Sequence, residues 1–138
     1  MVKVNNYEVP EELYYHKEYG WARIENGKAR IGITDYAQKQ LREIVFVELP
    51  SVGDTLKQNE PFGTVESVKA VSDLVAPVSG TIEQVNEELS DKPEVLNEDP
   101  YNKGWLLVIS PTNLDAELKQ LMDFNKAVEW HKELVKEG

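Results

Sequence analysis

Residues 62–80 read FGTVESVKAVSDLVAPVSG and contain a single cationic side chain, that of Lys69. The segments on either side have strand-like composition, so the sequence predicts a hairpin with Lys69 at its tip. Val68 and Ala70, which flank the lysine, are small and uncharged and would let the turn pack tightly against the body of the protein. The ε-amine would then project away from the sheet. A primary amine presented in this way is suited to acylation, which converts the cation into a neutral amide.

No other group of residues predicts a self-contained active site. His16 and His131 are far apart in sequence, and neither lies in a metal-binding spacing. His131 falls on the apolar side of a predicted helix, where it would pack against the core. Nucleophile-elbow, glycine-rich phosphate-loop and H-E-x-x-H motifs are missing from the sequence. The chain has no cysteine, which excludes a disulfide, a zinc–thiolate site and a cysteine nucleophile, so any thiol chemistry would come from a cofactor.

The totals predict a soluble, acidic, globular protein. The 138 residues are enough for one domain with its own core, and 41% of them are hydrophobic and 29% charged. The formal net charge of −10 argues against nucleic acid or an anionic membrane as the main partner. No apolar run approaches membrane-spanning length, and the first residues resemble neither a signal peptide nor a transit peptide. The expected location is the cytoplasm.

The elements expected to position Lys69 are mostly short strands. Residues 21–34 predict a hairpin around Asn26-Gly27, a dipeptide that tolerates positive φ in a tight turn. Thr34 is expected to cap a short helix over residues 35–42. Strands without a regular β–α alternation argue against a parallel, doubly wound sheet.

Further along the chain, two apolar runs predict buried strands at residues 44–50 and 104–110, with a long loop over 90–103. After the second strand, Asn113 is expected to cap one helix, and residues 124–136 form another with an apolar face. The whole is interpreted as a single domain over residues 1–138, divided into a lead-in (1–20), a β core (21–110) and C-terminal helices (111–138).

Several motifs in this order resemble the H protein of the glycine cleavage system. They are GITDYAQ, FVELPSVGD, ESVKAVSD, APVSG and NEDPYNKGW, and the likeness runs from about Trp21 to Ile109. Their combination at compatible separations is far more specific than a lone lysine. The resemblance implies a mainly β fold, a barrel–sandwich hybrid of the lipoyl/biotinyl-domain type, in which two sheets pack together with short peripheral helices and a C-terminal helical segment.

The resemblance also implies a function. Lys69 would carry lipoate through an amide bond, attached by a lipoate ligase or lipoyltransferase. The arm would take an aminomethyl group from glycine decarboxylase to a tetrahydrofolate-dependent aminomethyltransferase, and electrons to dihydrolipoyl dehydrogenase. The chain itself would be a monomeric carrier and not an enzyme, keeping a reactive group at high effective concentration near each partner.

Individual residues take roles from the same resemblance. Asp73 matches an aspartate beside the cleft that shields the loaded arm, although it could instead stabilise the turn. Glu66 and Ser67 either help the ligase to recognise the hairpin or simply solvate the strand end. Where the family commonly has a glutamate, this chain has Gly20, which puts the shielding of the arm in doubt. Glu18 could substitute, but strand alternation does not guarantee that it reaches the cleft.

Alternative functions remain open from the sequence. A lipoyl domain of a 2-oxoacid dehydrogenase complex is typically shorter and has aspartate before the lysine, whereas this chain has Val68 there. A biotin carrier usually has methionines beside its lysine. A lipoyl-relay or regulatory carrier of the same type would supply lipoyl groups to other proteins. This hypothesis stays open because Gly20 replaces the glutamate that is common in the family.

Overall fold

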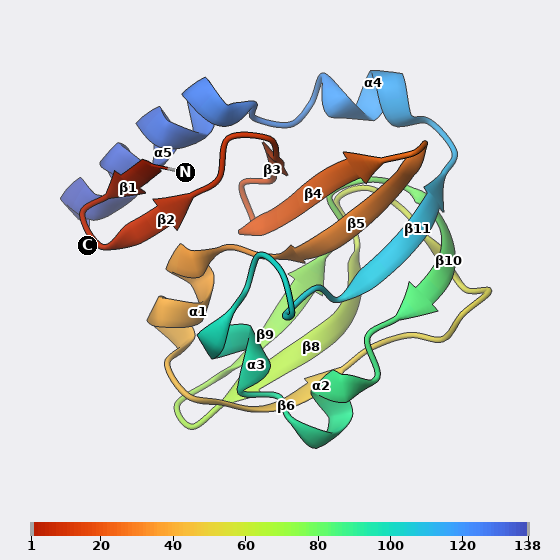
Figure 1. The fold of residues 1–138 in the computed structure, drawn as a ribbon, viewed down its shortest axis with the longest axis horizontal. Coiled ribbons are helices and arrows are strands. Elements are labelled where there is room, and N and C mark those ends of the chain that lie inside the picture. The colour runs from red at the N-terminus through yellow and green to blue at the C-terminus, as the bar shows by residue number, and fades with distance from the viewer. Residues whose placement is uncertain (1, 138) are drawn as a thin grey trace.

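Antiparallel sheets dominate the computed structural model, which describes residues 2–137 (Figure 1). Residues 1 and 138, the outer ends of the expected domain, lie outside the described residues. A six-stranded sheet has the order β3-β4-β5-β11-β10-β7, and a three-stranded sheet has the order β6-β8-β9. The strands of the larger sheet are β3 (Tyr14–Tyr15), β4 (Gly20–Glu25), β5 (Lys28–Ile33), β11 (Leu107–Pro111), β10 (Gly80–Val85) and β7 (Thr55–Leu56). Those of the smaller sheet are β6 (Ile44–Glu48), β8 (Pro61–Ser67) and β9 (Val71–Val75), and a separate ribbon pairs β1 (Val2–Val4) with β2 (Tyr7–Val9).

One apolar core holds the inward-facing side chains of the two larger sheets. Ile31 and Ile109 enter it from the six-stranded sheet, and Val65 and Leu74 enter it from the three-stranded sheet. Burying these side chains removes apolar surface from water, which is the main favourable contribution to folding. Two sheets around one core, with helices at the periphery, confirm the mainly β sandwich that the family resemblance implied.

The hairpin of β4 and β5 has the predicted turn. Asn26 and Gly27 both adopt positive φ, of 51° and 77°, between the paired residues Glu25 and Lys28. Positive φ at both central residues matches the right-handed twist of the flanking strands, and Asn-Gly is the dipeptide that tolerates it best. This turn therefore sets the register of the two strands.

Helix α1 (Asp35–Leu41) begins at the predicted cap and ends in a strained residue. Thr34 Oγ1 accepts a hydrogen bond from the Ala37 amide at 3.2 Å. Arg42 follows the helix with φ 69° and ψ −142°, a conformation that strongly favours glycine. Its amide donates to the Gln38 carbonyl at 2.8 Å, and its carbonyl accepts from Asn97 Nδ2 at 2.6 Å. These bonds hold the backbone in place against the steric cost.

Arg42→Gly is expected to raise the free energy of unfolding by about 1 kcal/mol, because glycine adopts positive φ without a Cβ clash. Urea denaturation measures the change. Glu43→Gly is the control, since Glu43 is exposed and does not have positive φ. There the added glycine should lower stability by enlarging the conformational freedom of the unfolded chain. A destabilised Arg42→Gly protein would contradict the strain argument.

The prediction of a buried strand over residues 44–50 is wrong about burial. Strand β6 covers residues 44–48, and only Ile44 and Val47 of it are buried. The register with β8 shifts between Ile44 and Phe46, so Val45 is the extra residue of a β-bulge. Val45 and Phe46 are both exposed as a result, at 43% and 51%. The apolar composition of β6 indicated a buried strand, but β6 is an edge strand with a bulge, and a bulge cannot be recognised from composition.

The long loop predicted over residues 90–103 overlaps the end of one short helix and contains another, and both helices have buried side chains. Helix α2 is Glu88–Asp91 and α3 is Val95–Glu98. Leu89 and Leu96 of these helices enter the main core. Asn97 binds three groups around the end of α1, its Oδ1 accepting from the Ile44 amide and its Nδ2 donating to Gln38 Oε1 and the Arg42 carbonyl. The turn-forming composition of this segment predicted a loop and did not indicate the two short helices or their contacts with the core.

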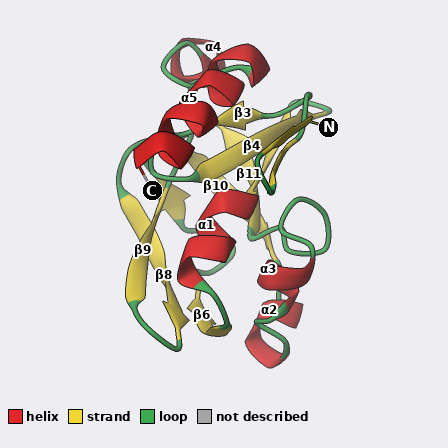
Figure 2. Cartoon of the chain, turned by 90° about the vertical axis from the view of Figure 1, so that its left-hand side faces the viewer, coloured by secondary structure: helices red, strands yellow, loops and turns green. Residues whose placement is uncertain are grey.

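The C-terminal region folds as two helices, as predicted. They are α4 (Leu114–Leu118) and α5 (Phe124–Glu137), and both lie at the end of the molecule opposite α2 and α3 (Figure 2). Asn113 occupies the N-cap position of α4, but its side chain makes no capping hydrogen bond. Helix α5 packs on β1, β2 and β3, so the expected lead-in contributes strands as well as a connection.

His131 of α5 is fully buried in an aromatic environment. Its Nδ1 lies 2.7 Å from the Ala127 carbonyl oxygen, so this nitrogen carries the proton and donates it. Its Nε2 has no hydrogen-bond partner among the described residues. The rings of Tyr15, Tyr36 and Trp130 surround it at centroid distances of 5.1–6.3 Å. The predicted packing role of this histidine is confirmed, and burial lowers its pKa because a charge there is poorly solvated.

Acid is expected to destabilise the protein through His131. The neutral form is favoured in the folded state, so the unfolded chain binds more protons once the pH falls below about 6.5. Stability is complete above that pH and then declines toward the lower folded-state pKa, with a slope of up to about 1.4 kcal/mol per pH unit. Urea unfolding between pH 7 and pH 5 should show a steeper decline for the wild-type protein than for His131→Leu. Parallel declines in the two proteins would overturn this expectation.

Candidate functional site

The hairpin tip between β8 and β9 holds Lys69 on a hydrogen-bonded backbone. The Ser67 amide donates to the Ala70 carbonyl at 2.8 Å. Ser67 Oγ accepts from the amides of Lys69 and Ala70 at 3.3 and 3.2 Å. The Val68 amide donates to the Glu43 carbonyl at 3.1 Å, which ties the tip to the segment before β6. The turn is therefore held by hydrogen bonds within the hairpin and by one to the segment before β6.

The Lys69 side chain lies in solvent above this fixed turn. The residue is exposed, as are its neighbours Val68 and Ala70. Within residues 2–137, no hydrogen bond or ion pair joins its ammonium group to another side chain. The hairpin extends toward the end of the molecule opposite α4 and α5 (Figure 2). Lys69 accordingly lies exposed at the tip of a β-hairpin, where the sequence placed it, and its reactivity stays a prediction.

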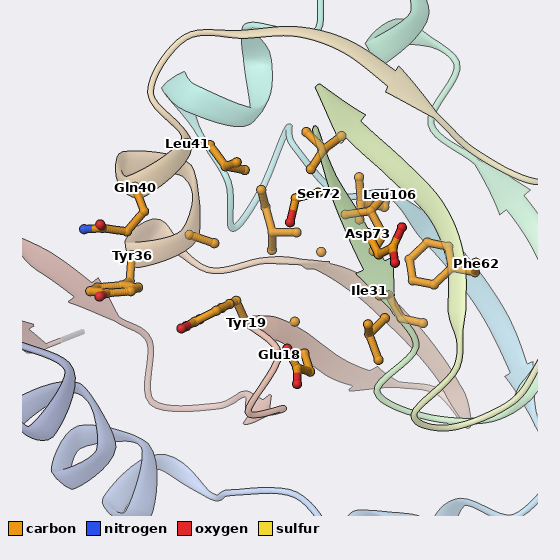
Figure 3. A pocket seen from close by; sticks show the side chains of 17 residues that line it. Glu18, Tyr19, Ile31, Tyr36, Gln40, Leu41, Phe62, Ser72, Asp73 and Leu106 are labelled. Carbon is orange, nitrogen blue, oxygen red and sulfur yellow. The ribbon is translucent and has the colours of Figure 1, made fainter. Parts of the chain in front are cut away.

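A cavity of about 270 Å³ lies beside the hairpin, along β9 (Figure 3). Its floor consists of buried apolar side chains from both large sheets and from the segment before β11, namely Ile31, Ile33, Val65, Leu74 and Leu106. Ser72 and Asp73 of β9 line it, only three and four residues after Lys69. Because an extended chain advances about 3.3 Å per residue, Asp73 is at most about 13 Å along the backbone from Lys69.

Two exposed acidic residues are among those that line the cavity. Asp73 comes from β9, and Glu18 comes from the turn that precedes β4. His16 shapes that turn, since its Nδ1 accepts a hydrogen bond from the Glu18 amide at 2.9 Å while Nε2 contacts Asn59 Oδ1 at 2.7 Å. Glu18 therefore reaches the same cavity as Asp73, although Gly20 provides no side chain there. The carboxylate of Asp73 makes no hydrogen bond with the described residues, so the alternative turn-stabilising role has no contact to support it.

One wall of the cavity is aromatic, and sequence reasoning missed it. Tyr19 has a positive φ of 75°, unusual for a bulky residue. Its ring stacks between Tyr36 of α1 and Trp130 of α5, at centroid distances of 5.6 Å on both sides. Tyr19 and Tyr36 line the cavity, and Figure 3 shows them on one side of it with Asp73 on the other. The contact joins three segments distant in sequence, so local patterns do not indicate it.

The remaining predicted residues lie near Lys69 but differ in exposure. Glu66 is exposed on the outer face of β8. Ser67 is only 5% exposed, so it does not solvate the strand end. Its side chain instead accepts hydrogen bonds from backbone amides of the turn. No group of histidines and acids among residues 2–137 has a metal-binding arrangement. In the same part of the chain, no helix is long and apolar enough to cross a membrane.

An exposed lysine on a fixed β-hairpin, beside a partly apolar cavity in a two-sheet sandwich, is the arrangement of a carrier domain of the lipoyl type. Comparison with known proteins agrees with this class. Residues 13–134 match the family model described as "Glycine cleavage H-protein". The chain belongs to the glycine cleavage H-protein family, and its function is that of a lipoyl-bearing shuttle protein in the glycine cleavage system.

Individual relatives support the same assignment. A probable glycine cleavage system H protein from Pyrococcus abyssi is 55% identical over 135 residues, which cover 97% of this chain and 100% of the relative. A glycine cleavage system H protein from a Geobacillus species is 53% identical over 129 residues, covering 94% of this chain and 98% of the relative. A crystal structure of such a protein from Mycobacterium marinum superposes with a TM-score of 0.73 at 38% identity, covering 81% of this chain and 98% of the other.

Proposed function

We propose that Lys69 Nζ carries the lipoyl group, in amide linkage. The observation that supports this most directly is the combination of an exposed lysine, a hydrogen-bonded turn and an adjacent cavity. The unprotonated amine attacks the carbonyl carbon of an activated lipoyl ester. The leaving group departs with the electron pair of its bond, and the nitrogen loses a proton as the amide forms. Holding the backbone still while the side chain is free lets an enzyme take up the amine at small entropic cost.

The cavity fits the arm by its chemistry. Its apolar floor suits the methylenes and sulfur atoms of a lipoyl group, and its position along β9 is within reach of Lys69. When bound, the lipoyl group supplies a disulfide that accepts an aminomethyl group from glycine and later returns two electrons. Asp73 and Glu18 would attract an ammonium group through their negative charge. Glu18 would thus supply the carboxylate that Gly20 lacks.

The proposed partners are the enzymes that load, unload and reoxidise this carrier. They are glycine decarboxylase, the tetrahydrofolate-dependent aminomethyltransferase, dihydrolipoyl dehydrogenase, and the lipoate ligase or lipoyltransferase that modifies Lys69. The chain has no catalytic role of its own in this proposal, and it acts as a monomer in the cytoplasm. Its acidic surface, with a formal charge of −10, suits brief encounters with basic patches on several partners.

Intact mass spectrometry tests the attachment. The unmodified protein is incubated with a lipoate ligase, ATP and lipoate, and its peptides are then mapped. One lipoyl-sized increment on the peptide containing Lys69 is the expected result. Modification at another lysine, or no increment with a ligase that is active on a known substrate, would refute the proposal. Glycine–bicarbonate exchange with glycine decarboxylase, measured on the loaded protein, then tests the shuttle role against a lipoyl-relay role.

A further inference from the structure

Four of the six exposed large apolar side chains described in residues 2–137 lie on the hairpin that bears Lys69 or on the neighbouring strand β6. They form what we call the tip patch, which consists of Val45, Phe46, Val68 and Val71. Their exposed fractions are 43%, 51%, 65% and 65%. Scattered exposed apolar residues are ordinary on a protein surface, but a cluster of them marks a contact site. Val52, which is 62% exposed, lies outside the patch, between β6 and β7.

The strand register places part of the tip patch on one face of the smaller sheet. Phe46 of β6 pairs with Glu66 of β8, and Glu66 pairs with Val71 of β9. Directly paired residues on neighbouring strands point to the same face. Phe46, Glu66 and Val71 therefore form a row across all three strands, on the outer side of the sheet. An apolar side chain stands at each end of this row, and a carboxylate stands at its centre.

The β-bulge in β6 adds to the patch. Regular alternation would turn one of Val45 and Phe46 inward, but the extra residue at Val45 leaves both exposed. Bulges commonly re-aim side chains beside functional sites. The same part of the chain is joined to the hairpin tip through the hydrogen bond from the Val68 amide to the Glu43 carbonyl. The edge strand and the tip thus both present exposed apolar side chains on the hairpin that bears Lys69 and on the strand beside it.

We infer that the tip patch is the docking surface for the enzyme that acylates Lys69. This inference rests on the proposed attachment at Lys69. Amide formation requires Nζ itself to come within bonding distance of an acyl carbon, so the acylating enzyme must take in the hairpin tip and contact the residues beside it. The reactions of the other partners take place at the far end of the arm, so their chemistry does not require Nζ or the hairpin tip to enter their active sites. The row of Phe46, Glu66 and Val71 is therefore best placed for the acylating enzyme.

The chemistry of the patch defines the matching surface of that enzyme. Phe46 and Val71 require an apolar surface around the opening that receives the lysine. Glu66 at the centre of the row requires a cationic side chain opposite it, because an unpaired carboxylate would be costly to bury. Buried aromatic anchors generally contribute most of the binding free energy of an interface, which makes Phe46 the residue expected to dominate.

Steady-state lipoylation by a lipoate ligase, with ATP and lipoate, tests the inference. Phe46→Ser is expected to lower kcat/KM for the carrier about tenfold or more, mainly through KM, and Val71→Ser should have a smaller effect in the same direction. Phe46→Leu should restore most of the rate. Val52→Ser is the matched control and should behave as wild type. Acetylation of Lys69 by a small activated ester should be equally fast in all variants, because it needs no docking.

Two results would overturn the inference. One is a Phe46→Ser protein that is folded, by circular dichroism, and is lipoylated at the wild-type rate. The other is self-association that depends on Phe46, seen by sedimentation, with unchanged ligase kinetics, which would assign the patch to a second copy of the chain. Failure of the proposed attachment is distinguishable, since the wild-type protein would then gain no lipoyl group at Lys69.

Discussion

Lys69→Arg is expected to abolish lipoylation and to reduce glycine–bicarbonate exchange to the rate measured without carrier. Arginine keeps the positive charge at the hairpin tip, but its guanidinium stays protonated and is not a nucleophile under these conditions. Since Lys69 is exposed and makes no hydrogen bond or ion pair through its side chain with the described residues, the fold should be unaffected. Intact mass after treatment with ligase, and exchange with glycine decarboxylase, measure the two effects.

Lys57→Arg provides the control for this experiment. The Lys57 side chain is 78% exposed and pairs only weakly with Glu60, at 3.9 Å. This variant should gain one lipoyl group and support wild-type exchange. Equal thermal stability of the wild-type and Lys69→Arg proteins would show that the loss arises from missing chemistry. Residual exchange by Lys69→Arg would mean that another lysine carries the group.

Gly32→Ala is expected to cause the largest loss of stability among the substitutions considered, about 3 kcal/mol. A Cβ at this position would overlap the indole ring of Trp21, which pairs with Gly32 across β4 and β5. Trp21 is fully buried and its Nε1 donates to the Pro100 carbonyl at 3.1 Å, so the ring has no free space to enter. Thermal unfolding should shift down by roughly 10 °C.

Gly20→Ala tests the same chemical change one pair along the two strands. Gly20 pairs with Ile33, and the nearest atoms to an added Cβ are 3.6 Å away, an ordinary contact distance. The substitution should change stability by less than about 0.5 kcal/mol. Similar losses in both variants would mean that the indole ring does not set the requirement for glycine at residue 32.

The hairpin with Lys69 could be predicted because its determinants are local. The β4–β5 turn follows from Asn26-Gly27, and the start of α1 follows from Thr34, for the same reason. Each depends on residues within a few positions of one another. The resemblance to a known family added the two-sheet arrangement, which composition and periodicity alone did not specify.

The features that could not be predicted depend on contacts between distant segments. The exposure of Val45 and Phe46 follows from a bulge whose position is set by pairing with β8. The aromatic wall requires Trp130 to meet Tyr19 across more than a hundred residues of sequence. Glu18 reaches the cavity because of a turn shaped by His16, whereas alternation along a regular strand left its position open.

The hydrogen bonds of Ser67 and Glu43 at the hairpin have a consequence for transport. These hydrogen bonds hold the backbone of the turn in place. The far end of a group attached to Lys69 therefore moves by rotation about the bonds of the side chain and of the attached group. Its positions lie within a limited distance of one point on the surface. A tether of this kind sets the local concentration of its cargo at a docked partner by length alone, independently of how much carrier is in the cell. A more mobile hairpin backbone would enlarge the volume accessible to the attached group and lower its effective concentration at each partner's active site.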